Sequence, residues 1–183
     1  MLKLKVLKLV ALLIISSQSW ADQEVRVRLA TNEHAITLKG LSLSFSANSK
    51  VLAIGNSKKL LTSKHDVRKE KGFWLLGKAK VYAERIKVFG DFIQINSHQY
   101  IPSGSELIGK RNGGFDIVAK MPLDDYLKVV LPSEMPVAWP MQALKAQAVA
   151  SRSYTLSLLN ERKHLHFDVE ATIADQVFDL INH

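Results

Sequence analysis

The feature that most constrains the fold is a long series of short, apolar-rich segments between residues 22 and 120, separated by glycines. The first segment, EVRVRLA at residues 24–30, alternates apolar side chains with arginines, which is the two-residue period of a half-buried strand. Glycines and Asn-Ser pairs mark turns between the runs. Many short strands with glycine-containing turns predict a small β sandwich or barrel. The later runs are AITLKG, LSLSF, KVLAIG, GFWLLG, RIKVFG, FIQIN and, after a hairpin turn expected at residues 112–114, FDIVAKMP.

The composition changes at Pro122, where strand-like runs give way to helix-forming sequence. PLDDYLKVVLP is compatible with a short helix that carries Leu123, Tyr126, Leu127 and Val130 on one side. A second helix is expected to follow, because proline suits the first helical position and the sequence after residue 140 is rich in Ala, Leu, Gln and Lys. The predicted class is therefore α+β. The predicted segments are a signal peptide at 1–21, a β-rich region at 22–99 and a helix-containing core at 100–183.

Residues 1–21 have the pattern of a secretory signal. Three lysines precede a short apolar run at residues 9–15, and small residues occupy the two positions that signal peptidase reads. We expect cleavage between Ala21 and Asp22, and export to the periplasm, the cell wall or the medium. The alternative is an uncleaved anchor, for which the apolar run is short. After removal of the signal, no stable membrane span is expected.

The composition limits the chemistry available to the chain. The sequence contains no cysteine, so disulfides, thiolate metal sites and a lipoprotein anchor are excluded. The net charge is +8, of which the three signal lysines contribute 3. A modestly basic exported protein is suited to the anionic polymers of a cell envelope. No long basic run with interleaved aromatics occurs, so no nucleic-acid partner is expected.

Glu134 lies between Pro132 and Pro136, beside the apolar Met135 and Trp139. A carboxyl group partly removed from water has a raised pKa, and a protonated carboxyl can donate a proton to a leaving oxygen. The alternative is a structural role, in which Glu134 accepts backbone N–H bonds near a helix start. Residue chemistry alone leaves both open.

Two cations on the second predicted helix form the next candidate. Lys145 and Arg152 are seven residues apart, which places them on one helix face, and Ala148 between them would let a ligand or backbone approach. The alternative is a solvated cationic face. Arg152 is expected to pack against a carboxylate.

A metal site is weakly suggested. His164 and His166 alternate as on a strand and Asp168 follows, but two histidines without a cysteine or a third positioned ligand are a poor zinc signature. No phosphate-binding glycine loop, Ser-His-Asp order or His-Glu-x-x-His helix occurs. We therefore expect no metal and no cofactor.

The segment MPLDDYLKVVLPSEMPVAWPMQALKAQAVASRSYTL, at residues 121–156, closely resembles the core of the stage II sporulation protein D and amidase-enhancer (SpoIID/LytB) family. The shared features are the Pro-x-Glu-Met-Pro turn, the Trp-Pro pair and the nearly unbroken string from Ala143 to Tyr154. DQVF at 175–178 resembles the closing Gln-Val-Tyr motif, and EVRVRLAT resembles the strand that often opens these proteins. Family members continue beyond that closing motif, so a core truncated at its C-terminus is expected.

The resemblance implies action on cell-wall peptidoglycan. Sporulation members of the family resemble lytic transglycosylases, which cut glycan strands that lack stem peptides and leave a 1,6-anhydro sugar. On that resemblance the catalytic glutamate corresponds to Glu134 and a supporting arginine to Arg152. Lys145 and Gln147 take glycan-contacting or structural roles, and Gln176 in the closing motif takes a substrate-binding role.

A single glutamate is sufficient for a lytic transglycosylase, because it acts first as an acid toward the glycosidic oxygen and then as a base toward the 6-hydroxyl of the sugar. A hydrolase needs a second carboxylate. The alternative function is non-enzymatic: a wall-binding protein that enhances an N-acetylmuramoyl-L-alanine amidase. Peptidoglycan strands and a cell-wall amidase are the expected partners, and whether the chain is an enzyme stays open.

Overall fold

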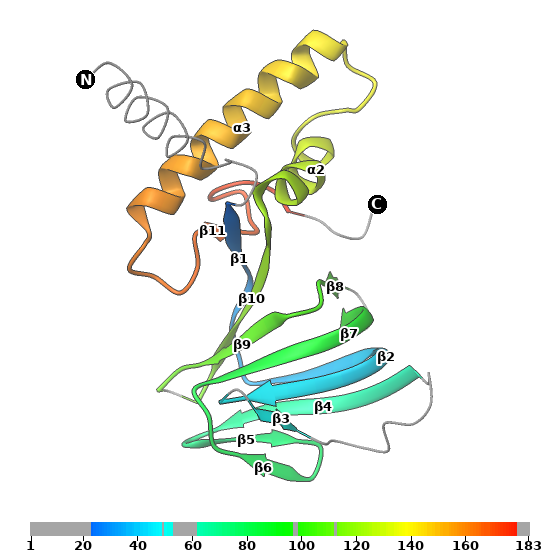
Figure 1. The fold of residues 1–183 in the computed structure, drawn as a ribbon, viewed down its shortest axis with the longest axis vertical. Helices are drawn as coiled ribbons and strands as arrows, with labels where there is room; N and C mark the ends of the chain where they lie inside the picture. Colours follow the sequence, from blue (N-terminus) through cyan, green and yellow to red (C-terminus); the bar gives the residue numbers. More distant parts are fainter. Residues whose placement is uncertain (1–22, 49, 53–61, 97–98, 112, 179–183) are drawn as a thin grey trace, which may run out of the picture.

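The computed structural model describes residues 23–48, 50–52, 62–96, 99–111 and 113–178 (Figure 1). The predicted α+β class is confirmed, because this part of the chain forms one large sheet and two helices. The signal peptide predicted at residues 1–21 lies outside the described residues. No helix in the described ranges is long and apolar enough to cross a membrane. The elements are β1 Glu24–Glu33, β2 Ala35–Ala47, β3 Lys50–Leu52, β4 Thr62–Glu70, β5 Phe73–Leu76, β6 Ala79–Val81, β7 Arg85–Ile95, β8 Gln99–Ile101, β9 Ser105–Gly109, β10 Phe115–Pro122, α2 Leu123–Glu134, α3 Met141–Glu161 and β11 Val169–Glu170.

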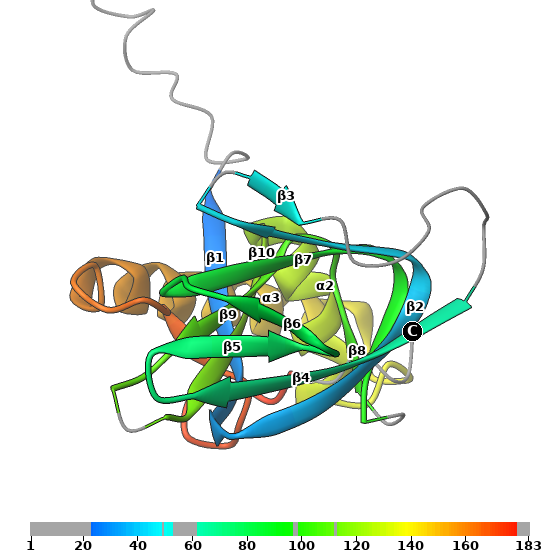
Figure 2. The ribbon, with the colours of Figure 1, turned by 90° about the horizontal axis from the view of Figure 1, so that it is seen from below.

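The strands form a single sheet in the order β11-β1-β10-β9-β7-β2-β4-β5-β6, with β3 paired to β2 and β8 paired to β7. All pairs are antiparallel except β1 with β11. Seen from below, the sheet curls so that β9, β7, β2, β4 and β5 surround a common interior (Figure 2). The predicted sandwich of separate sheets is therefore not found. Among the described strands, the hydrogen-bonded order begins at β11 and ends at β6. The sheet is therefore curled but open, and it does not close into a barrel.

The curl depends on a sharp bend in the central pair β2 and β7. The register of this pair shifts twice, between Lys39 and Leu41 and between Leu41 and Ser44. Gly90 lies at the bend with a positive φ of 149°, and a Cβ at this position would stand 2.7 Å from the carbonyl oxygen of Leu41. Only glycine fits so close an approach of two backbones. The bend turns a flat ribbon into a wrapped sheet.

The long strands β1 and β10 connect two hydrophobic cores. The curled sheet encloses the first core, and α2, α3 and the C-terminal segment cover the second (Figure 1). On β10, Ile117 belongs to the first core and Ala119 to the second, while Leu29 of β1 packs against both. The sheet continues to Pro122, well past residue 99, so the proposed boundary between residues 99 and 100 falls inside β8 and stays a prediction.

The polar face of β1 is covered by the chain that follows α3. Arg26 donates from Nε to Asp168 Oδ2 at 2.9 Å, and Arg28 forms an ion pair with Glu170. The Arg28 guanidinium also lies 3.8 Å from the centroid of the Phe167 ring. The arginines that alternate with apolar residues in β1 are therefore anchors for the segment that leads to the candidate site.

Candidate functional site

A cavity of about 280 Å³ lies between the end of α2, one face of α3 and the C-terminal segment. Three of the predicted site residues line it: Glu134, Gln147 and Gln176. The complete lining is Glu134, Gln147, Ala150, Ser151, Tyr154, Asp175 and Gln176. The structure thus brings the PSEMP turn, the alanine-rich helix and the DQVF motif together at one place.

Glu134 is the last residue of α2, and its side chain is exposed. The expectation of a carboxyl group sheltered in a stiff turn is therefore wrong. Pro132 does not end the helix, because the carbonyl it leaves without a helical donor belongs to Lys128 on the exposed side of α2, where water can reach it. The Val177 N–H donates to Glu134 Oε1 at 2.7 Å. Glu134 thus accepts a backbone N–H, as the structural alternative proposed, but from a distant segment and not from a helix start.

The backbone N–H of Val177 is positioned by the side chains of its two sequence neighbours, Gln176 and Phe178. The carboxamide oxygen of Gln176 lies 2.9 Å from the hydroxyl of Tyr126 and 2.9 Å from that of Thr155, and all three residues are buried. Phe178 stacks on Tyr126 with ring centroids 5.7 Å apart. Burial raises the pKa of Tyr126 far above its usual value, so this phenol remains a proton donor. With Gln176 and Phe178 both anchored, the N–H between them has a fixed direction toward Glu134.

Asp175 is a second carboxylate in the cavity, and its charge is balanced by an ion pair. Its side chain is 3% exposed and forms an ion pair with Arg162, whose Nη2 lies 2.9 Å from Oδ1. The Glu170 N–H donates to Oδ2 at 2.8 Å, and the Tyr154 hydroxyl lies 3.3 Å from Oδ1. Burial acts to raise the pKa of Asp175, but the bonds from Arg162 and Glu170 outweigh it and lower the pKa below its usual value. Among the described residues Glu134 has no cationic partner, which distinguishes the two carboxylates.

The two predicted cations do not reach the cavity. Their spacing places Lys145 and Arg152 on one face of α3, but the cavity is lined from a different face by Gln147 and Tyr154. Arg152 does contact a carboxylate, as expected, but its partner is Asp124 in the first turn of α2. Lys145 is exposed. The predicted ordering of Glu134 by Arg152 is not what the structure shows.

The histidines after α3 are not assembled into a metal site. His166 Nε2 lies 2.8 Å from Asp116 Oδ2, and Asp168 is paired with Arg26. No group of three or more potential ligands (His, Cys, Asp or Glu) gathers within the part of the chain that the structure describes.

Sequence reasoning missed Asp175 and Tyr154 as cavity residues. Asp175 is the first residue of the DQVF motif and Tyr154 is the last residue of the alanine-rich string, so both residues lie within motifs that the sequence shows. Neither carries a local pattern that indicates a shared cavity. Only the path of the chain after α3 brings them together.

Residues 111–183, which contain the whole cavity, match the family described as stage II sporulation protein (SpoIID). This match supports the resemblance of this part of the chain to the SpoIID/LytB family. The chain resembles a protein of Brachyspira hyodysenteriae that is named only as uncharacterized, with 40% identity over 90 residues, 49% of this chain and 24% of the relative. It also resembles the amidase enhancer of Bacillus subtilis, with 33% identity over 95 residues, 45% of this chain and 14% of the relative. The chain thus spans less than a quarter of the length of these two relatives, and no solved structure matches it.

Proposed function

We propose that this chain is an exported protein that acts on the glycan strands of peptidoglycan, with Glu134 as the single acid/base of a lytic transglycosylase-like cleavage. The observation that carries the proposal is the state of the two carboxylates in the cavity. Glu134 is accessible and has one oxygen fixed by the Val177 N–H, whereas Asp175 is buried and tied to Arg162. The second oxygen of Glu134 receives no hydrogen bond from the described residues and is the one available to a ligand.

The reaction needs one carboxyl group and no water. Protonated Glu134 gives its proton to the glycosidic oxygen as the bond from that oxygen to C1 breaks. The 6-hydroxyl of the same sugar then bonds to C1 and its proton passes to Glu134, which leaves a 1,6-anhydro sugar and restores the acid. Inverting hydrolysis would require a second carboxylate to activate water. Asp175 is unsuited to that role, because accepting a proton would disrupt its pair with Arg162.

A second candidate function is stimulation of a cell-wall amidase without glycan cleavage. The relative from Bacillus subtilis is named an amidase enhancer. The loop between α2 and α3 and the first residue of α3 also expose large apolar side chains: Val137 is 72% exposed, Trp139 52% and Met141 63%. Several exposed apolar side chains close together on the surface are typical of a region that contacts a partner protein.

The deciding experiment is Glu134→Gln in the 183-residue chain, assayed on glycan strands that lack stem peptides. The amide keeps an acceptor for the Val177 N–H but has no transferable proton. Release of anhydro-muramic ends should fall by about 10²–10⁴-fold. Glu161→Gln is the matched control, because it makes the same chemical change at an exposed position of α3 outside the cavity.

Undiminished anhydro product from Glu134→Gln would remove the catalytic assignment. If the unchanged chain releases no anhydro ends but accelerates an added amidase on whole sacculi, the enhancer function replaces the transglycosylase. In that case Trp139→Ala should reduce the acceleration and Glu134→Gln should not.

A further inference from the structure

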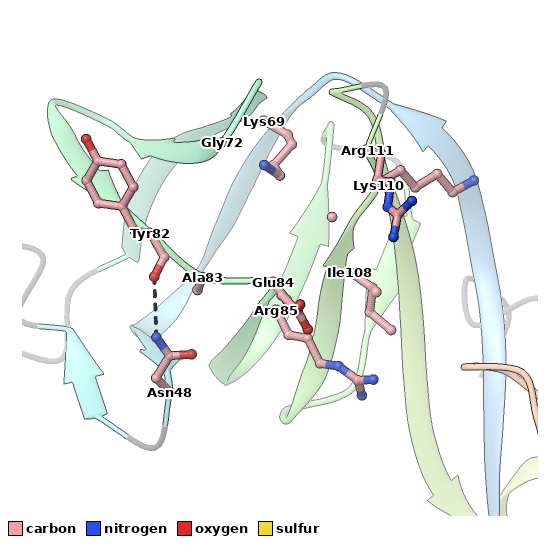
Figure 3. Close-up of a pocket in the computed structure, with 11 residues that line it drawn as sticks. Asn48, Lys69, Gly72, Tyr82, Ala83, Glu84, Arg85, Ile108, Lys110 and Arg111 are labelled. Carbon is pink, nitrogen blue, oxygen red and sulfur yellow. Dashed lines mark hydrogen bonds between the residues drawn. The ribbon is translucent and has the colours of Figure 1, made fainter.

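A second cavity, of about 650 Å³, lies in the β half of the molecule and shares no residue with the Glu134 cavity. It opens where the end of β4 and the connection from β6 to β7 face the end of β9 (Figure 3). Its position is a direct result of the curl of the sheet, which brings these distant strands toward one another. The reaction proposed above makes no use of it.

The charge of this cavity is predominantly positive. Three cationic side chains, Lys69, Arg85 and Arg111, line it together with one acid, Glu84. A fourth cation, Lys110, is directed away toward β1 (Figure 3), where its Nζ lies 2.7 Å from Asp116 Oδ1. Setting Lys110 aside, the lining carries an excess of two positive charges.

The cations have little compensation from protein carboxylates. Lys69 donates to the backbone carbonyl of Glu70 at 2.9 Å, and no carboxylate among the described residues pairs with it. Burial lowers the pKa of Lys69, because its ammonium is partly removed from water. Arg111 is exposed and is likewise without a described ion-pair partner.

Arg85 shares its acid with two other cations. Its guanidinium stands 3.4 Å from Glu106, which also lies 2.9 Å from Lys120 and 3.6 Å from Lys87. One buried carboxylate therefore serves three positive groups, and these groups lower its pKa although burial opposes them. Glu106 therefore neutralises Arg85 only in part.

Tyr82 stands at the rim of the cavity and is 69% exposed. Its ring is directed away from most of the other lining side chains (Figure 3) and lies 6.0 Å from that of Phe73. Gly109 lets Lys69 approach the backbone closely, because a Cβ there would stand 2.6 Å from Lys69 Cε and 3.2 Å from the Trp74 ring. Planar guanidinium groups, such as that of Arg111, bind carboxylate or phosphate oxygens in pairs.

We propose that this cavity binds an anionic carbohydrate or polyol chain through its carboxylate or phosphate oxyanions, with Lys69 and Arg111 as the principal contacts. Its volume lies within the range of about 300–1,000 Å³ that is typical of ligand pockets. The site would hold an anionic polymer of the envelope on the β half while the Glu134 cavity remains free. The inference does not depend on glycan cleavage.

The test measures binding of two oxyanion probes by the whole chain: an oligomer of glycerol phosphate and an oligomer of galacturonate. Lys69→Gln combined with Arg111→Gln should weaken binding of the preferred probe by about tenfold or more, since both variants remove a charged hydrogen-bond donor to the oxyanion. Binding should also weaken as salt increases. The matched control is Lys39→Gln combined with Lys64→Gln, which removes the same charge from exposed, paired positions of β2 and β4.

The probes distinguish the sources of the oxyanion. Tighter binding of glycerol phosphate assigns a phosphate polymer, and tighter binding of galacturonate assigns a carboxylate polymer. Equal weakening by the two double variants would overturn the site in favour of general charge attraction, and failure of the unchanged chain to bind either probe would also overturn it.

Two further variants separate this site from folding and from the Glu134 cavity. If the Lys69 and Arg111 double variant does not fold, the exposed Arg111→Gln alone carries the test. Gly109→Ala leaves the charge unchanged but places a Cβ 2.6 Å from Lys69 Cε, so it should displace Lys69 and also weaken binding. Glu134→Gln should leave oxyanion binding unchanged, so failure of the proposed cleavage and failure of this site give different results.

Discussion

The ion pair between Arg162 and Asp175 offers the sharpest test of how the candidate site is held. Arg162 is the residue that follows α3, and Asp175 lies in the segment that carries Gln176 and Val177 to Glu134. Arg162→Met keeps most of the aliphatic stem and removes the charge and all hydrogen-bond donors. Asp175, with a side chain only 3% exposed, would then keep the Glu170 N–H but lose its cation.

The expected loss of stability at neutral pH is about 3 kcal/mol, because removing one partner of a buried ion pair costs about 3–5 kcal/mol and the Arg162 side chain is itself 26% exposed. The sign of the pH dependence follows from the pKa of Asp175, which is lowered in the native protein. Its stabilisation is present above the unfolded-state pKa of about 3.9 and is lost as the pH falls through the lower folded pKa. In the variant, burial without a cation raises this pKa, so acidification relieves the penalty.

The assay is urea-induced unfolding of both proteins at pH 7 and pH 4. The difference in unfolding free energy should shrink by about half or more between the two pH values, because the raised pKa of Asp175 in the variant favours its protonation as the pH falls. Asp175→Asn is the control, and adding it to Arg162→Met should restore part of the lost stability by removing the unpaired charge. A difference below about 1 kcal/mol at pH 7, or one that is the same at both pH values, would refute this account of the pair.

Three other predictions concern single features of the chain. Arg152→Ala should change the free energy of unfolding by no more than about 1 kcal/mol, because its pair with Asp124 is solvent-exposed; a clear loss of glycan binding by the folded variant would show that Arg152 acts on the ligand. Tyr126→Phe should cost about 1–2 kcal/mol in chemical denaturation by removing a buried donor to Gln176, and an unchanged midpoint would contradict the hydrogen-bond geometry. If residues 1–21 are a cleaved signal, N-terminal sequencing of the exported protein should begin at Asp22, and retention of Met1 on a cytoplasmic protein would remove the proposed access to the wall.

The individual strands could be predicted because their periodicity is local. In β1 the alternation in the sequence corresponds directly to burial, with Val25 and Val27 fully buried and Arg26 and Arg28 on the other face. The curl of the sheet could not be predicted in the same way. It depends on Gly90 meeting Leu41, residues of two strands that are far apart in sequence, and the local pattern of neither strand specifies its partner or register.

The helices show the same division between local and distant causes. The four apolar residues expected on one side of the first helix, Leu123, Tyr126, Leu127 and Val130, are its buried residues. The end of that helix was misjudged, because proline in an exposed last turn leaves only one carbonyl to the solvent, a cost that the helix tolerates. Placing the helix end two residues too early turned an exposed glutamate into an apparently sheltered one.

The candidate site was the least predictable part, because its deciding contacts involve backbone atoms and paired charges. The donor to Glu134 is the Val177 N–H, and every residue except proline carries such a group, so no sequence pattern distinguishes this one. What selects it is the anchoring of Gln176 by Tyr126 and Thr155 and the fixing of the segment by Arg162. Each of these contacts links α2, α3 or the end of α3 to a segment with little regular structure of its own. The DQVF motif therefore acts on Glu134 indirectly, because the contacts of Asp175 and Gln176 set the direction of the Val177 peptide that holds Glu134. A substitution of either residue should change the environment of Glu134 although neither side chain bonds to it.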